Sequence, residues 1–341
     1  MDLIVLQPTG IMMLYAAGFN AWNQLCFDRK HEESEPNDVF AFTKVLEAQH
    51  IDPPVSRQSY TLVRHDGCLS MAGFGLQDQE AYQAAYSSAE AENDEILDVV
   101  DDAPDISSAA NEGVPQHRLV KYASASARAA RTADKTWPCK KPVSAVAAFA
   151  TGFIILHQDG TVDTLGDARY QDCLGRQVDD ESPAEDPCLV SDLADLDEPV
   201  THVSAGGYTL AALTRSGALY LWGTCPTNVQ AGQNFMPNLN NIPNYVQVDG
   251  DEDVRDVALG ESHAIVLMMD GALHVIGDNG NGQLGLGDST VKGCSSWTKV
   301  SLNLPQGHQV VAVAAGPRAS FILTASKSTL DNHDADICSN P

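Results

Sequence analysis

Apolar and polar positions alternate along this chain in a unit that recurs several times. Each unit is a short apolar strand, a turn glycine, a second apolar strand and a closing glycine six residues after the first. Because the alternation has a period of two, each unit predicts an antiparallel hairpin with one buried face. The clear copies are Thr61–Gly73, Phe153–Gly166, Leu210–Gly223 and Ala264–Gly277.

The turns and the spacing between units predict a ring of hairpins. A tight primed turn requires positive φ, which Gly and Asp tolerate. Successive turn glycines are 57 residues apart from Gly160 to Gly217 and 54 apart from Gly217 to Gly271, which is close to the size of a propeller blade. One hairpin cannot bury its apolar face alone, so stacked neighbours must cover it. The chain is therefore predicted to be all-β. The Asp-Gly turns are Asp66-Gly67, Asp159-Gly160 and Asp270-Gly271.

Two half-units occupy the ends of the pattern. Met13–Leu25 matches the second half of a unit, because it shares a glycine, an asparagine, a glutamine and a leucine with His274–Leu284. Val310–Thr324 matches the first half, as found in Val200–Thr214. This arrangement predicts a ring closed by one blade to which both ends of the chain contribute.

These units resemble the regulator-of-chromosome-condensation repeat, which reads roughly V-A-A-G-x-x-H-S/T-x-x-L-T-x-D-G-x-V-Y-x-W-G-x-N-x-x-G-Q-L-G. The best match is Val257–Gly287, followed by Val203–Gly223, and the resemblance covers about residues 10–75 and 143–325. The resemblance implies about seven blades, whereas five units are visible, so six or seven blades are expected. We expect one propeller domain over residues 1–325 and a polar C-terminal tail over 326–341.

The stretch between the second and third visible units matches nothing and is highly charged. The chain has a net charge of −26, and residues 77–117 hold eleven acids and no Lys or Arg. Residues 117–141 then hold seven of the twenty basic residues and one acid. We expect a charged insertion at about 77–141, acidic over 77–117 and basic over 118–141. If so, deleting residues 77–111 leaves the ring folded; a degenerate blade within the segment is the alternative.

This charged segment also provides the candidate partner-binding residues. The acidic part is either a solvated loop or a docking surface for a basic partner. The basic part either pairs with the acidic run or contacts a protein, since the negative field of the whole chain disfavours nucleic acid. A second acidic connector, residues 178–198, is likewise expected to be solvated. The candidate residues are Glu92, Asp94, Glu95, Asp101, Asp102, Arg118, Lys121, Arg128 and Arg131.

Patterns that indicate chemistry are missing from the sequence. The ten histidines lack metal-binding spacing, and the eight cysteines form neither C-x-x-C pairs nor a disulfide framework. The glycine-rich Gly277–Gly287 stretch is not followed by an amphipathic helix, so we interpret it as a connector and not as a phosphate loop. His263 is expected to be a structural residue near the ring axis. We predict no catalytic residues, no metal and no cofactor, and a cytoplasmic or nuclear location.

A non-catalytic adaptor that binds proteins as a regulatory subunit is the favoured function. The apolar N-terminal residues are expected to form a blade strand and not a membrane segment. By resemblance, the partner is a JmjC-type oxygenase, the zinc-ribbon factor of diphthamide synthesis and Elongator-dependent tRNA modification, or a small GTPase. Guanine-nucleotide exchange on a small GTPase, as performed by the founding family member, is the alternative function. It is less favoured because no basic N-terminal tail and no matching wedge segment are found.

Overall fold

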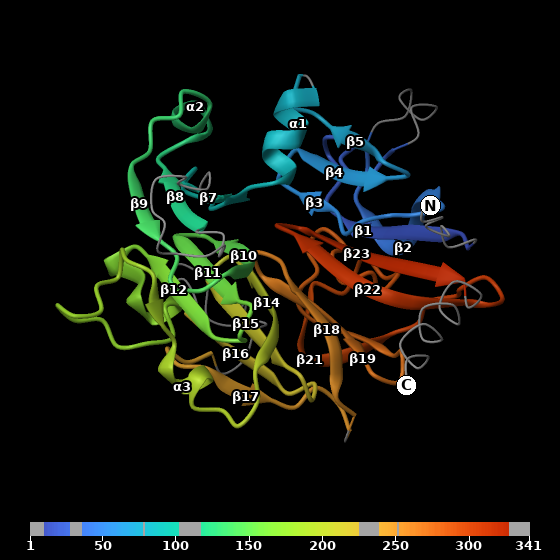
Figure 1. Ribbon diagram of the computed structural model, residues 1–341. Helices are drawn as coiled ribbons and strands as arrows, with labels where there is room; N and C mark the ends of the chain where they lie inside the picture. The colour runs from blue at the N-terminus through green and yellow to red at the C-terminus, as the bar shows by residue number, and fades with distance from the viewer. Residues whose placement is uncertain are drawn as a thin grey trace, which may run out of the picture.

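Six antiparallel sheets follow one another around a ring in the described residues of the computed structural model (Figure 1). The structure describes residues 10–27, 36–77, 79–101, 117–224, 239–250 and 252–326. Each sheet is one blade, and the six blades fall within the predicted range of six or seven. The predicted all-β propeller is confirmed.

The first blade contains both ends of the described chain, as predicted. Its strand order is β2-β1-β23-β22, and β1 pairs with β23 without interruption from Met12 opposite Ala325 to Gly18 opposite Ala319. Ring closure therefore rests on backbone hydrogen bonds between strands from opposite ends of the sequence. The strands are β22 (His308–Gly316), β23 (Ala319–Ser326), β1 (Met12–Gly18) and β2 (Val39–Ala48).

The asparagine that the two half-units share has a structural role. Asn20 Oδ1 accepts the backbone N–H of Leu25 at 2.9 Å, and Asn279 Oδ1 accepts that of Leu284 at 3.0 Å. Both asparagines are buried, where an unpaired amide would be costly. The repeat signature thus specifies a closed loop after the third strand of a blade.

While the first clear repeat, Thr61–Gly73, lies in the second blade, three further blades correspond to the last three clear repeats. The second strand of each is buried at all six positions, so the prediction of one buried face is wrong for these strands, because each propeller sheet packs both faces against neighbouring blades. The strands are, for the fourth blade, β10 (Val143–Phe149), β11 (Gly152–His157), β12 (Val162–Gly166) and β13 (Cys188–Leu189); for the fifth, β14 (Val200–Gly206), β15 (Thr209–Thr214), β16 (Leu219–Gly223) and β17 (Asn244–Val246); and for the sixth, β18 (Val254–Leu259), β19 (His263–Met268), β20 (Leu273–Asp278) and β21 (Gly293–Val300).

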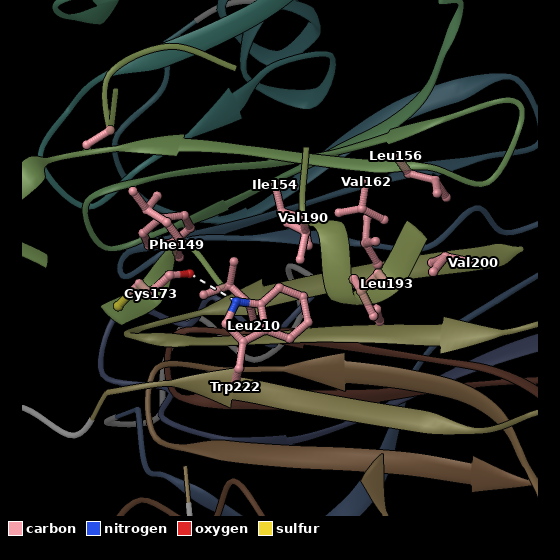
Figure 2. Packing of buried hydrophobic residues seen from close by; sticks show 14 residues of the cluster. Phe149, Ile154, Leu156, Val162, Cys173, Val190, Leu193, Val200, Leu210 and Trp222 are labelled. Atoms are coloured by element: carbon pink, nitrogen blue, oxygen red, sulfur yellow. Dashed lines mark hydrogen bonds between the residues drawn. The ribbon is translucent and has the colours of Figure 1, made fainter. Parts of the chain in front are cut away.

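The core consists of apolar clusters between adjacent blades. Figure 2 shows the cluster between the fourth and fifth blades, in which the fully buried Trp222 lies against residues of both. Its indole N–H donates to the Cys173 carbonyl oxygen at 3.1 Å. Cys173 ends a short 3₁₀ helix (η2, Ala168–Cys173), and α3 (Ser191–Ala194) contributes the buried Leu193.

The second blade is short on its outer side. It has three strands, β3 (Val55–Ser56), β4 (Tyr60–His65) and β5 (Cys68–Gly73), and the helix α1 (Gln79–Tyr86) packs beside β5. The Arg64 guanidinium lies 5.2 Å from the centre of the Tyr86 ring and donates to Gln83 at 3.1 Å. The helix therefore covers an edge that a fourth strand covers in other blades.

The charged segment contains the third blade, so the expectation of an insertion at 77–141 is corrected. Its strands are β6 (Ala89–Glu90), β7 (Ile96–Asp101), β8 (His117–Tyr122) and β9 (Lys135–Pro138), with α2 (Ala125–Ala129) between the last two. Leu97 and Leu119 pack with Phe153 and Leu165 of the fourth blade. The repeat pattern is hidden because β7 and β8 are not joined by a tight Asp-Gly turn.

The turns between the first and second strands of the blades gather around the axis at one end of the ring. We call this end the turn face. Ala150 N donates to Gly207 O at 2.6 Å, and Glu261 N donates to Pro317 O at 3.0 Å, so neighbouring turns bond to each other. At Gly207, where φ is +53°, a Cβ would collide with the Glu261 carbonyl oxygen. The turn residues are 58–59, 91–95, 150–151, 207–208, 261–262 and 317–318.

An ion pair connects the two blades whose first strands are shortest. Arg57 Nε of the second blade lies 3.5 Å from Glu90 Oε2 of the third, and both side chains are largely buried. The first strands of the other neighbouring blades pack directly against each other. The ring is thus continuous around the axis, with a polar contact at one junction.

Deleting residues 77–111 should destroy cooperative unfolding, because the deletion removes β6 and β7 and uncovers Phe153 and Leu165. Circular dichroism and calorimetry of the deletion variant would measure this. A deletion of residues 103–111 alone keeps all four strands and is the matched control. A single sharp transition in the larger deletion would contradict the third blade.

The buried His263 predicts an acid-dependent loss of stability. Burial lowers its pKa to about 4, whereas an unfolded histidine titrates near 6.5, so the unfolded state binds more protons between these values. Stability is intact above pH 6.5 and falls as the pH drops toward 4, by about 2 kcal/mol at pH 5 from this group.

Urea unfolding of the wild type and of His263→Thr, at pH 7.5 and pH 5, would test this. Threonine occupies the equivalent position in the fifth blade (Thr209) and does not titrate. The variant should lose about 2 kcal/mol less than the wild type between the two pH values. Equal losses would show that His263 does not control the acid response.

Candidate interaction site on the turn face

Acidic and basic halves of the charged segment pair with each other inside the third blade. Lys121 Nζ on β8 lies 3.0 Å from Glu95 Oε1 and 3.3 Å from Asp134 Oδ2. Burial desolvates this ammonium and favours its neutral form, but the bonds to the two carboxylates outweigh burial and raise its pKa. Lys121 is therefore a charged residue within the blade, as the alternative of intramolecular pairing predicted.

A second pair fixes the helix α2. Arg128 Nε lies 2.6 Å from Asp98 Oδ2 on β7, and its Nη1 donates to the Ala84 carbonyl of α1 at 3.0 Å. Ser124 caps α2 by accepting the Ala127 N–H at 3.2 Å. One arginine thus joins the connector after β8 to the acidic strand and to the neighbouring helix.

The predicted site residues do not form one cluster. Glu92, Asp94 and Glu95 lie in the β6–β7 turn on the turn face, and Lys121, Arg128 and Arg131 lie at the same end of the blade. The backbones of Asp101 and His117 pair at the opposite end, next to the exposed Arg118, and Asp102 lies outside the described residues. Asp94 and Arg131 are exposed, with φ of +67° and +54°. The structure thus divides the predicted set between the two faces.

A cleft of about 380 Å³ separates the third and fourth blades on the turn face. Phe153 and Leu165 line it together with four carboxylates and two lysines. Both lysines have carboxylate partners, so the lining carries a surplus of negative charge. Its charged residues are Glu95, Lys121, Asp134, Lys135, Asp167 and Glu185.

The wall of this cleft is held by the second acidic connector. Asp186 forms an ion pair with Lys135 and accepts the indole N–H of Trp137 at 3.0 Å. The bond from Lys135, followed by that from Trp137, outweighs desolvation and lowers the pKa of Asp186. The buried Arg176 donates to the carbonyl oxygens of Ser182 and Pro183, each at 2.9 Å. This part of residues 178–198 is therefore packed, whereas a solvated loop was expected.

Opposite charges also meet near the axis. Arg318 Nε of the first blade lies 3.3 Å from Glu261 Oε2 of the sixth blade. Desolvation, followed by repulsion from Glu261, raises the pKa of Glu92, and Arg318 partly offsets both. Burial, followed by the interaction with Tyr170, raises the pKa of Tyr208, and Glu92 adds to this shift. Three blades thus bring carboxylates and one guanidinium together around the axis.

Sequence reasoning missed the residues that shape the cleft. Asp134, Lys135 and Glu185 carry no repeat motif, and Asp167 follows a closing glycine where the repeat allows many residues. The runs of charged residues are the only sequence signal that could have indicated these positions. No metal-competent cluster of His, Cys, Asp or Glu occurs among the described residues, and no helix described there could cross a membrane. The charged cleft and the charges near the axis are therefore suited to binding a charged partner.

Models of the "Regulator of chromosome condensation (RCC1) repeat" match residues 254–283 and 270–323. The "Regulator of chromosome condensation" of Mus musculus is 35% identical over 133 residues, which are 39% of this chain and 30% of that protein. The human E3 ubiquitin-protein ligase HERC2 is 31% identical over 128 residues, 38% of this chain and 2% of that protein. The chain spans about a third of the length of the first curated relatives it matches.

Among solved structures, Prp20p from Saccharomyces cerevisiae has the same fold. It is 13% identical, with a TM-score of 0.61, and the match covers 97% of this chain and 95% of that one. That protein is described with its binding properties to Gsp1p and histones. The repeat matches, the shared terminal blade and this likeness agree: residues 254–323 match the RCC1 repeat, and the chain has the β-propeller fold of Prp20p.

Proposed function

We propose that this chain is a non-catalytic adaptor that binds a protein partner on its turn face, as a regulatory subunit of a larger complex. The observation that carries the proposal is the cleft between the third and fourth blades. Its walls are fixed by internal ion pairs, so little ordering is required when a partner binds. A rigid ring that presents loops at one end is suited to docking.

The charge of the cleft favours a partner with a basic contact. Glu185 is exposed, and the described residues contain no ion pair to its carboxylate. Asp167 pairs with Arg169, whose side chain is 81% exposed. A partner lysine or arginine at this cleft would meet two carboxylates without breaking the pairs of Lys121 or Lys135.

Nucleotide exchange on a small GTPase is the second candidate. The binding of Prp20p to Gsp1p and histones supports a protein partner for this chain, and the repeat resemblance favours a small GTPase, but the fold likeness by itself carries no activity to this chain. The JmjC-type oxygenase and the zinc-ribbon factor rest on the sequence resemblance and remain predictions, as does a cytoplasmic or nuclear location.

Reversing one charge in the cleft should weaken the partner complex. Glu185→Lys places a cation where the partner's basic group binds, so co-purification with the tagged full chain should fall about tenfold or more, measured by quantitative mass spectrometry. Asp192→Lys on α3 lies in the same acidic connector but outside the cleft lining, and it should bind normally. Equal recovery by Glu185→Lys and the wild type would exclude the cleft as the docking site.

A nucleotide-release assay separates the two candidate functions. If the chain is an adaptor, substoichiometric amounts should leave GDP release from a panel of small GTPases unchanged. Fluorescent-nucleotide release with and without the chain measures this. Multiple turnovers of release by one molecule of the chain would contradict the adaptor proposal and establish exchange.

A further inference from the structure

Two aromatic side chains are exposed side by side on the turn face. Trp22 follows β1 of the first blade and Phe74 follows β5 of the second, with 51% and 71% of their surfaces exposed. Their ring centroids are 6.4 Å apart and their planes differ by 23°. They form one apolar patch across a blade junction, which we call the aromatic pair.

The propeller fold does not require aromatic residues at these positions. The loop of Trp22 has the same backbone N–H to glutamine Oε1 bond as the loop in the sixth blade, where Asn281 stands at its position. Phe74 follows a closing glycine; at this position the first blade has Phe19, and the fourth, fifth and sixth blades have the polar residues Asp167, Thr224 and Asp278. The chain's own repeats thus show that polar residues suit both positions, and the exposed apolar surface has to be explained by something other than folding.

The backbone beneath the pair is held in place. Trp22 N donates to Gln24 Oε1 at 2.8 Å, and Gln24 Nε2 donates to the Gln58 carbonyl at 3.1 Å. Phe74 N donates to the Ser59 carbonyl at 2.8 Å. Both aromatic residues are therefore anchored to the turn of the second blade, and a partner would meet a surface that is already arranged.

The charges of the same face limit what the partner can be. Six of its cations are already paired with carboxylates and Arg131 is exposed, while Glu92, Asp94 and Glu185 are exposed acids, so the exposed acids outnumber the exposed cation. A second copy of this chain would bring another charge of −26 and be repelled. A partner segment with lysines or arginines would be attracted. The paired cations are Arg57, Lys121, Arg128, Lys135, Arg169 and Arg318.

We propose that Trp22 and Phe74 anchor a protein segment that combines an apolar side chain with neighbouring lysines or arginines. The apolar side chain packs on the aromatic pair, and the cations face the acids of the turn face. Buried aromatic residues dominate the energy of many interfaces, which fits two pre-arranged rings in an otherwise polar surface. This inference rests on the proposed function and names the chemistry of its partner.

The test compares full chains that carry the residues of the chain's own repeats. Trp22→Asn with Phe74→Thr removes the pair, and Tyr245→Asn removes a 61% exposed aromatic residue on the outer strand β17 as the control. Proteins recovered in stoichiometric amounts with the tagged wild type are quantified for each variant. A carbodiimide then cross-links carboxylates of the turn face to partner lysines, and thermal unfolding checks that each variant folds.

The expected result is a loss of about tenfold or more for the double variant, normal recovery for Tyr245→Asn, and cross-links from Glu92 or Asp94 to a basic segment with an apolar residue. A folded double variant that recovers the partner at the wild-type level would overturn the inference and leave the adaptor proposal intact. Cross-links confined to an acidic segment, or a dimer of this chain lost in the double variant, would also overturn it. A wild type without a stoichiometric partner would mark failure of the adaptor proposal itself.

Discussion

Burial of both faces of every blade is the constraint on which the rest of the structure depends. A blade is a thin sheet, and the second strands of the fourth, fifth and sixth blades are buried at every position because neighbours cover both sides. An open row of blades would leave two faces exposed. The pairing of β1 with β23, through seven consecutive residue pairs, closes the ring so that these two faces are covered. The ring, its axis and its turn face all follow from this closure.

The third blade shows how charge replaces repeat motifs as a structural device. Its acidic strand β7 pairs with the basic strand β8, Lys121 on β8 pairs with Asp134, and Arg128 on α2 pairs with Asp98 on β7. Segregated charge runs in the sequence thus become neighbours in one sheet. An exposed pair contributes little, but the Lys121 and Arg128 side chains are mostly buried, where opposite charges interact more strongly.

Much of the architecture could be predicted from the sequence, because hairpin periodicity and closing glycines are local signals. The shared blade followed from two half-units, and the asparagine loops at Asn20 and Asn279 explain why those half-units match. The third blade was only the alternative to an insertion, since its strands lack the turn dipeptide and its charges suggested solvent exposure. The cleft could not be predicted from the sequence, because Glu95 and Glu185 are 90 residues apart and only packing between blades brings them together.

The bonded turns around the axis connect this architecture to binding. The turns at Gly207, Glu261 and Pro317 fix one another through backbone contacts, so side chains projecting from them have little freedom relative to the ring. The backbone positions that carry the charges of these turns are therefore set by the ring. A partner that meets all of these features must match their spacing as well as their chemistry. In the proposed complex, specificity would therefore come from geometry set by the buried faces, with the exposed residues supplying the chemistry.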